Sequence, residues 1–255
     1  SPGGTGANNQ YEFFTRTETR ISKIQSLKNA ANSFVNTVKA KSPDSRIGVV
    51  SFANNGTTDT NSNNRSLLRV GNAASYTEIT RAINALSPSG ATRSDYGFDR
   101  VKELYDAPSK FETVNTNSNR DKLIIFFTDG VPTTASDFSD TVANAAISRA
   151  NTLKGSPYNT SIYSIGIFQN ITGNALTRVE NYMRSVASDK AGGGKHYYKV
   201  EASEELLNLF DSITEVIGGP LQDVYIKDYI DPRFGVLDNN GNMITNTSST
   251  VNLSN

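Results

Sequence analysis

The stretch KLIIFFTDG at residues 122–130 is the clearest indication of the fold. Five consecutive apolar residues end abruptly at Thr128, Asp129 and Gly130. An uninterrupted apolar run of this kind is typical of a strand buried on both faces of a parallel sheet, because a strand with one solvated face alternates apolar and polar residues. Residues 122–130 therefore predict a buried strand that carries Asp129 to its carboxyl end.

Two other apolar stretches share this pattern. RIGVVSFA at residues 46–53 and SIYSIGIF at residues 161–168 are rich in β-branched residues, which predicts two more buried strands. Shorter strands are predicted at residues 66–70 and 196–200. Between the strands, apolar residues recur at steps of three and four, as on one face of an amphipathic helix. The predicted helices comprise about residues 20–41, 76–86, a segment through Val101 and Tyr105, 139–154, 176–186 and 204–217.

The alternation of strands and helices predicts the fold class. It indicates βαβ units, and therefore an α/β, doubly wound, mostly parallel sheet with helices on both faces. The alternation ends at Pro220, after which VYIKDYI alternates along a strand and Asn240-Gly241 predicts a hairpin turn. We therefore predict an α/β domain at residues 1–219, in which residues 1–20 are a loop insertion, and the beginning of a β-sandwich-like domain at residues 220–255.

The composition restricts the chemistry that a site can use. The 25 Lys and Arg balance 25 Asp and Glu, so no overall charge favours nucleic acid or an anionic membrane. With no Cys and a single His, thiol catalysis, disulfides and zinc fingers are excluded. Any metal is then expected to be a hard ion held by oxygen atoms. Because no pair of nucleophile and base is visible, we predict that the protein is not an enzyme.

The composition also bears on location. The chain holds 28 Asn, more than its 25 Lys and Arg together, which indicates hydrated, uncharged loops and, with no Cys, favours a bacterial extracellular protein. The opening SPGGTGANNQ has no basic start and no apolar core, so it is not a signal peptide, and we expect Ser1 to be an internal position of a longer protein. No apolar run reaches the roughly 18 residues that suggest a membrane span.

Two loops at predicted strand ends hold candidate site residues. Ligands of doubly wound sheets bind beyond the carboxyl ends of the strands, where Asp129 would suit a divalent cation, although an Asp before Gly is also a common turn residue. Thr92, in the loop Ser89-Gly90-Ala91-Thr92, would offer a neutral oxygen or cap the next helix. Ser89 and Asp95 are further ligand-binding candidates, and Asp95 also suits the first turn of a helix because of the helix dipole.

Taken in order, these stretches resemble the von Willebrand factor A family. The helix of residues 21–38, then RIGVVSFA, Gly90-Ala91-Thr92 before a helix, KLIIFFTDGVPT and SIYSIGIF match that family over about residues 20–217. The resemblance implies a metal ion-dependent adhesion site with Thr92 and Asp129 as metal-site residues. It implies Mg²⁺ as the usual ion, with Mn²⁺ or Ca²⁺ as alternatives, and an acidic group of a partner as a further ligand.

The chain departs from the family pattern at its start. The family's first strand, which ends in Asp-x-Ser-x-Ser, should precede the helix at residue 21, and nothing before Arg20 matches it. A similar motif at residues 137–141 follows Asp129 without an apolar strand before it, so we interpret it as a helix start. A sheet without its central strand leaves buried backbone groups unpaired. We therefore expect the natural chain to continue upstream with this strand, and metal binding to depend on that segment.

A narrower resemblance concerns the kind of protein. The insertion at residues 1–20, the polar loops and the β-rich continuation resemble pilus tip adhesins and wall-anchored surface proteins of Gram-positive bacteria, in which β-sandwich stalk domains carry such a head. The resemblance implies a non-enzymatic adhesin on the cell wall or pilus that binds a host or matrix protein. Tyr11, Phe13 and Phe14 would then contact the ligand or pack the insertion onto the domain. Lys227 is either an isopeptide lysine of the stalk or an ordinary solvated side chain.

Two other functions stay open at this point. One is a structural or assembly module without a working metal site, and the other is an intracellular partner of an ATPase. His196 has no second His with which to form a site, so a structural role is the better explanation. GGGK at residues 192–195 lacks the spacing and the Ser or Thr of a P-loop, and instead predicts a turn into the last strand.

Overall fold

The computed structural model describes residues 22–60, 67–106, 121–135, 137–169, 171–201 and 203–217. The helices are α1 (Lys23–Lys41), α2 (Ala73–Ala85), α3 (Ser94–Asp106), α4 (Asp140–Lys154), α5 (Gly173–Val186) and α6 (Ser203–Ile217). The strands are β1 (Arg46–Ile47), β2 (Val50–Phe52), β3 (Gly56–Thr58), β4 (Leu68–Arg69), β5 (Lys122–Thr128), β6 (Thr160–Gly166) and β7 (Tyr197–Lys199).

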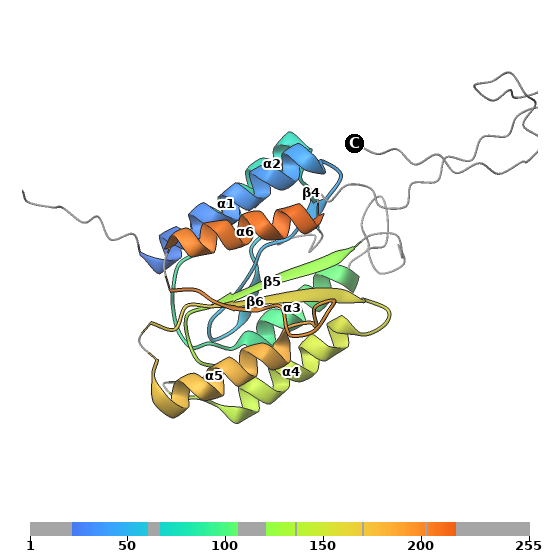
Figure 1. Ribbon diagram of the computed structural model, residues 1–255. Helices are drawn as coiled ribbons and strands as arrows, with labels where there is room; N and C mark the ends of the chain where they lie inside the picture. The colour runs from blue at the N-terminus through green and yellow to red at the C-terminus, as the bar shows by residue number, and fades with distance from the viewer. Residues whose placement is uncertain are drawn as a thin grey trace, which may run out of the picture. The chain divides into compact units, whose positions relative to one another are not determined.

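Helices cover both faces of the sheet. Figure 1 shows α1, α2 and α6 on one side of β5 and β6, and α3, α4 and α5 on the other side. Strands β5, β6 and β7 form a parallel sheet in that order, with β5 and β6 in register from Lys122 opposite Thr160 to Thr128 opposite Gly166. The α/β fold with a parallel sheet, predicted from the alternating pattern, is therefore confirmed.

The helices begin where polar side chains can cap them. The side-chain oxygens of Ser22, Asn72 and Ser139 accept hydrogen bonds from backbone amides in the first turns of α1, α2 and α4. Such caps satisfy amide groups that have no partner within the helix. Each predicted helix is present within the described residues, and its ends differ from the predicted ends by a few residues.

The stretch RIGVVSFA differs from its prediction as one buried strand. It divides into β1, which pairs antiparallel with β4, and β2, which pairs antiparallel with β3. Between β1 and β2, the Val49 amide donates a hydrogen bond to the side-chain oxygen of Thr60 at 3.0 Å. A side-chain oxygen therefore replaces the backbone carbonyl that a neighbouring strand would offer. All residues of this stretch are half-buried. The apolar pattern therefore identified a strand-forming stretch but not its antiparallel partners.

Two apolar cores lie on the two faces of the parallel sheet. On one face, α3, α4 and α5 pack on Ile124, Phe126 and Ile162. On the other face, α1 and α6 pack on Tyr163 and Ile165. β6 lies between the two cores and is almost entirely buried. This double covering explains why its sequence is apolar without a polar alternation.

The β5 edge of the sheet borders a cavity. Among the described residues, β5 is hydrogen-bonded as a strand to β6 alone. A cavity of about 1080 Å³ lies beside β5 and is lined also by α1, α3, β1 and β2. Ile124 and Phe126 are buried, whereas Leu123, Ile125 and Phe127 are only half-buried. Because full burial of such a side chain contributes about 1.5–3 kcal/mol, the half-buried face of β5 gains only part of that stabilisation.

Several sequence predictions lie outside the described residues. These are the loop insertion with Tyr11, Phe13 and Phe14, the domain boundary at Pro220, and Lys227 in the segment after it. Within the part of the chain that the structure describes, no helix is both long and apolar enough to cross a bilayer.

Candidate functional site

Asp129 lies at the carboxyl end of β5. It follows Thr128, whose buried hydroxyl accepts a hydrogen bond from the Gly130 amide at 3.2 Å and so supports the turn. The Ile167 amide donates to the Thr128 carbonyl at 3.1 Å, which joins the ends of β5 and β6. The Asp129 side chain is 57% exposed. A well-supported strand end therefore presents a carboxylate to solvent.

Thr92 lies in a loop that is held by the end of β2. Gly90 has a φ of +68°, a conformation that glycine adopts without strain. The Ala91 amide donates to the side-chain oxygen of Asn54 at 2.9 Å, and the Arg93 amide donates to the Ala53 carbonyl at 2.9 Å. Asn54 was not singled out by the sequence because an Asn in an Asn-rich loop carries no distinguishing signal. Its position after an apolar strand is the only hint.

The structure brings the Thr92 loop against the turn that follows Asp129. The Thr133 amide donates to the Thr92 carbonyl at 3.3 Å, in an isolated antiparallel bridge. A Cβ atom added at Gly130 would lie 2.9 Å from the Thr92 hydroxyl oxygen, so a side chain at this position would require the hydroxyl to shift. The hydroxyl of Thr92 and the residues beside Asp129 therefore share one edge of the sheet. That Thr92 and Asp129 bind a metal ion stays a prediction.

Lys23 adds a positive charge to the same edge. Its Nζ lies 3.6 Å from Oδ2 of Asp129 and donates to the Ile167 carbonyl at 3.5 Å. Lys23 is the first residue of α1, so the amino end of α1 lies at the carboxyl ends of β5 and β6. The sequence did not predict this contact, since Lys23 and Asp129 are far apart in the chain.

Ser89 and Asp95 occupy different environments. Ser89 is exposed in the Thr92 loop and lines the cavity beside β5. The Asp95 side chain is only 3% exposed. Its two carboxylate oxygens accept hydrogen bonds from the Arg93 guanidinium at 2.9 and 2.7 Å, and Nη1 of Arg149 lies 3.8 Å from Oδ2 of Asp95. Burial opposes ionisation, but the hydrogen bonds and charge of Arg93, with the charge of Arg149, lower the pKa of Asp95 overall. Its carboxylate is therefore engaged inside the protein.

The donor atoms at the edge fit a hard cation in kind. The Asp129 carboxylate and the Thr92 hydroxyl are oxygen ligands of the type that Mg²⁺ prefers. Within the described ranges, no group of three or more His, Cys, Asp and Glu is placed to hold a metal ion. Since Mg²⁺ takes about six ligands, these two residues would supply a minority of them. Water, a ligand or residues outside the described ranges would supply the others.

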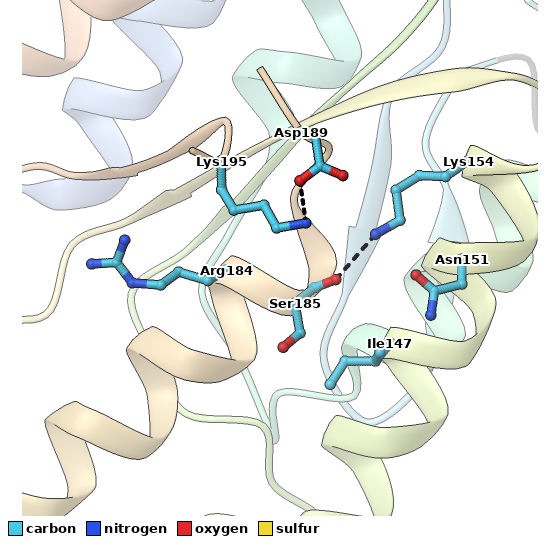
Figure 2. A pocket seen from close by; sticks show the side chains of 7 residues that line it. All are labelled: Ile147, Asn151, Lys154, Arg184, Ser185, Asp189 and Lys195. Carbon is cyan, nitrogen blue, oxygen red and sulfur yellow. Dashed lines mark hydrogen bonds and ion pairs between the residues drawn. The ribbon is translucent and has the colours of Figure 1, made fainter. Parts of the chain in front are cut away.

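A second pocket, of about 610 Å³, lies between the carboxyl ends of α4 and α5 (Figure 2). The Lys154 ammonium donates to the carbonyls of Ser185 at 3.1 Å and Ala187 at 3.3 Å, and Lys195 pairs with Asp189 at 2.6 Å. Burial, aided by the charge of Lys195, lowers the pKa of Lys154. Both lysines have structural partners, and helix carboxyl ends repel anions, so we assign no ligand to this pocket.

The turn before β7 and His196 have structural surroundings. Gly192, Gly193 and Gly194 all have positive φ angles and form the predicted turn into β7. The His196 ring packs on Tyr163 with ring centroids 4.1 Å apart. These contacts agree with a structural explanation of both features.

Comparisons with known proteins identify the fold family. The von Willebrand factor type A domain matches residues 18–212, which is more than half of the chain. No curated protein matches the chain. Several solved structures match it, at identities low enough that the likeness concerns the fold alone.

Three of these structures illustrate the likeness. The pilus adhesin SpaC from Lactobacillus rhamnosus GG, in an open conformation, has a TM-score of 0.58 at 12% identity, covering 76% of this chain and 28% of that one. A von Willebrand factor type A protein from Catenulispora acidiphila has a TM-score of 0.55 at 13% identity, covering 77% and 39%. Proximal thread matrix protein 1 from the mussel byssus has a TM-score of 0.53 at 19% identity, covering 76% and 43%. The chain thus spans less than half the length of each of these proteins.

Proposed function

The chain belongs to the von Willebrand factor type A family, and on that premise we propose that its α/β domain is a non-enzymatic adhesin head. The head binds an extracellular protein ligand through a divalent cation at the edge formed by Thr92 and Asp129. Mg²⁺ is the proposed ion, with Mn²⁺ or Ca²⁺ as alternatives. The pilus adhesin among the similar folds supports an adhesin-like role.

One observation carries this proposal. The Thr92 loop meets the turn after Asp129 so closely that a Cβ atom at position 130 would lie 2.9 Å from the Thr92 hydroxyl oxygen. A side-chain hydrogen bond holds each loop: Asn54 accepts from the amide of Ala91, and Thr128 accepts from the amide of Gly130. Fixed oxygen atoms on supported loops require little reorganisation when a cation binds, and this favours a binding site over two unrelated turns.

The charges at this edge suit an acidic ligand. A bound divalent cation would supply a fixed positive charge and a Lewis acid toward a carboxylate of the partner. Of the two described residues, Asp129 would neutralise one of the two charges and Thr92 would contribute none. Lys23 places a further positive charge at the same edge. No bond is broken, so the residues act by orientation and charge.

We propose the bacterial cell surface, on the cell wall or a pilus, as the location. Residues 220–255 would begin a stalk domain that carries the head. The pilus adhesin among the similar folds supports this location, and its greater length is in keeping with a head that is one part of a larger protein.

A structural or assembly module is the second candidate. The ion pair of Lys23 with Asp129 favours it, because Lys23 provides a counter-charge without any metal ion. A thread matrix protein is also among the similar folds. In this case Thr92 and Asp129 would serve only to join two loops.

Ligand binding measured with and without a chelator separates the two candidates. The full-length protein is tested on immobilised collagen, fibronectin and host cells, in Mg²⁺ and in EDTA. Asp129→Asn and Thr92→Ala should each reduce binding at least tenfold, and EDTA should do the same. Asp137→Asn, an exposed Asp beyond the Thr92 contact, is the matched control and should bind normally. If EDTA and both site variants leave ligand binding unchanged, the metal-dependent mechanism is rejected.

A further inference from the structure

The turn between β2 and β3 carries the sequence Asn54-Asn55-Gly56. Within the described ranges, Gly follows Asn only here, and both Asn side chains are exposed. The side-chain carbonyl carbon of an Asn is open to attack by the backbone nitrogen of the next residue, and glycine hinders this attack least because it has no Cβ atom. Asn55 therefore has the neighbour that this reaction favours, and Asn54, which precedes another Asn, does not.

The backbone amide of Gly56 points away from β2. In an antiparallel pair of strands, facing residues that exchange hydrogen bonds alternate with facing residues that do not. The Asp59 amide donates to the Val49 carbonyl at 2.8 Å, so these two residues form a hydrogen-bonded pair. Gly56 lies three positions before Asp59 and faces Phe52, and it therefore belongs to a pair that exchanges no hydrogen bonds. The nitrogen that would attack Asn55 is thus not engaged in the ladder of the hairpin.

We propose that Asn55 is a site of spontaneous deamidation. The Gly56 nitrogen attacks Cγ of Asn55, a C–N bond forms, and the side-chain nitrogen leaves as ammonia. Water then opens the resulting five-membered imide at either of its carbonyls, which gives aspartate or isoaspartate. The net reaction consumes one water and releases one ammonia, without an enzyme or a cofactor. Asn is among the thermolabile residues of proteins for this kind of reason.

The isoaspartate product would loosen the Thr92 loop. In isoaspartate the main chain runs through the former side chain and is longer by one carbon–carbon bond, about 1.5 Å. Gly56 cannot shift toward α3, because a Cβ atom added there would already lie 2.3 Å from the Tyr96 carbonyl oxygen. The displacement therefore falls on Asn54, whose side-chain oxygen accepts from the Ala91 amide at 2.9 Å.

Two further contacts join this turn to the Thr92 loop. The Ala53 carbonyl accepts from the Arg93 amide at 2.9 Å. On the other side, a Cβ atom added at Gly90 would lie 2.9 Å from Oδ1 of Asn54, so the two backbones are in close contact there. A displaced turn would disturb both contacts, and the loop would lose the support that the hairpin gives it.

Peptide mapping of the incubated protein tests the chemistry. The 255-residue chain is kept at mildly alkaline pH and 37 °C in EDTA, so the result does not depend on the proposed metal site. The mass gain of about 1 Da and the isoaspartate content are followed at Asn55 and at Asn54. Asn55 should react at least about tenfold faster, and Asn54 is the internal control because it is equally exposed. If Asn55 reacts no faster than Asn54, the proposed site is wrong.

Hydrogen exchange of the Ala91 amide tests the structural effect. In the isoaspartate form this amide should exchange about tenfold faster than in fresh protein, because its acceptor on Asn54 is displaced. Asn55→Gln, which would have to close a larger ring, should keep the original exchange rate after the same incubation. Fresh Asn55→Asp carries the new charge without the longer main chain and should also match fresh protein. If the isoaspartate form protects Ala91 fully, or if Asn55→Asp alone releases it, the proposed effect of the longer main chain is wrong.

Discussion

Lys23 at the start of α1 and Asp129 at the end of β5 form an ion pair, with Nζ 3.6 Å from Oδ2. The pair is partly exposed, and Lys23 also donates to the Ile167 carbonyl. α1 is thereby attached to the edge of the sheet at which Asp129 is presented. The same contact places a protein cation where the proposed divalent cation would bind, so the two positive charges should oppose each other.

Replacing Lys23 should strengthen cation binding. Partly exposed ion pairs contribute about 0.2–1 kcal/mol, and removing such a competitor should raise the Mg²⁺ affinity by a factor of roughly 1.4 to 5. Lys23→Met and the unaltered protein are compared by calorimetric titration with Mg²⁺. Lys28→Met, which loses a hydrogen bond to the Asn84 carbonyl farther along the same helix, should leave the affinity unchanged. An equal or weaker affinity of Lys23→Met would contradict the competition.

Gly130→Ala should disturb the site with little effect on stability. The new Cβ atom would lie 2.9 Å from the Thr92 hydroxyl oxygen, so the hydroxyl must move. We expect Mg²⁺ affinity to fall severalfold, while the free energy of unfolding changes by less than about 1 kcal/mol, because the atom that moves is the end of a side chain. Gly155→Ala has its nearest contact at 3.5 Å and serves as the control for both measurements. If Gly130→Ala leaves the Mg²⁺ affinity unaltered, the Thr92 hydroxyl is not a ligand of the ion.

Asp95→Ala should destabilise the fold. Its buried carboxylate accepts two hydrogen bonds from Arg93 and lies 3.8 Å from Arg149, and because both arginines are partly exposed, we expect a cost of about 1–3 kcal/mol. Urea unfolding of the variant measures this loss. Glu78→Ala removes a partner of the exposed Arg81 and should have a much smaller effect. If Asp95→Ala unfolds like the wild type but loses ligand binding, Asp95 is a site residue and not a structural one.

Stability should fall as the pH drops from 7 to 5 because of His196. Burial, with the charge of Lys190, lowers the pKa of His196 below its ordinary 6.5. The unfolded chain then binds more protons than the folded chain in this range, so acidification favours unfolding. The melting temperature of His196→Phe, which keeps an aromatic ring against Tyr163, should depend less on pH over the same range. Since His196 is the single His of the chain, an unchanged pH dependence would show that other groups cause it.

The helices and the parallel strands were predictable because their signals are local. The apolar runs at residues 122–128 and 161–166 report burial on both faces, and periodicity in three- and four-residue steps reports a helix packed on one side. RIGVVSFA was predicted only in part. Its division into β1 and β2 depends on β3, β4 and Thr60, and no local pattern in residues 46–53 specifies these partners.

The sequence by itself determined the α/β order, and together with the family resemblance it predicted Thr92 and Asp129 as metal-site residues. Only the tertiary structure decided what surrounds them. Lys23 reaches a carbonyl 144 positions away, and Asn54 holds a loop 37 positions away. Contacts over such separations depend on how helices and strands pack together, and hydrophobic periodicity records only that a residue is buried, not which residue it meets. The same packing leaves the apolar cavity beside β5, which no local pattern within residues 122–128 could show.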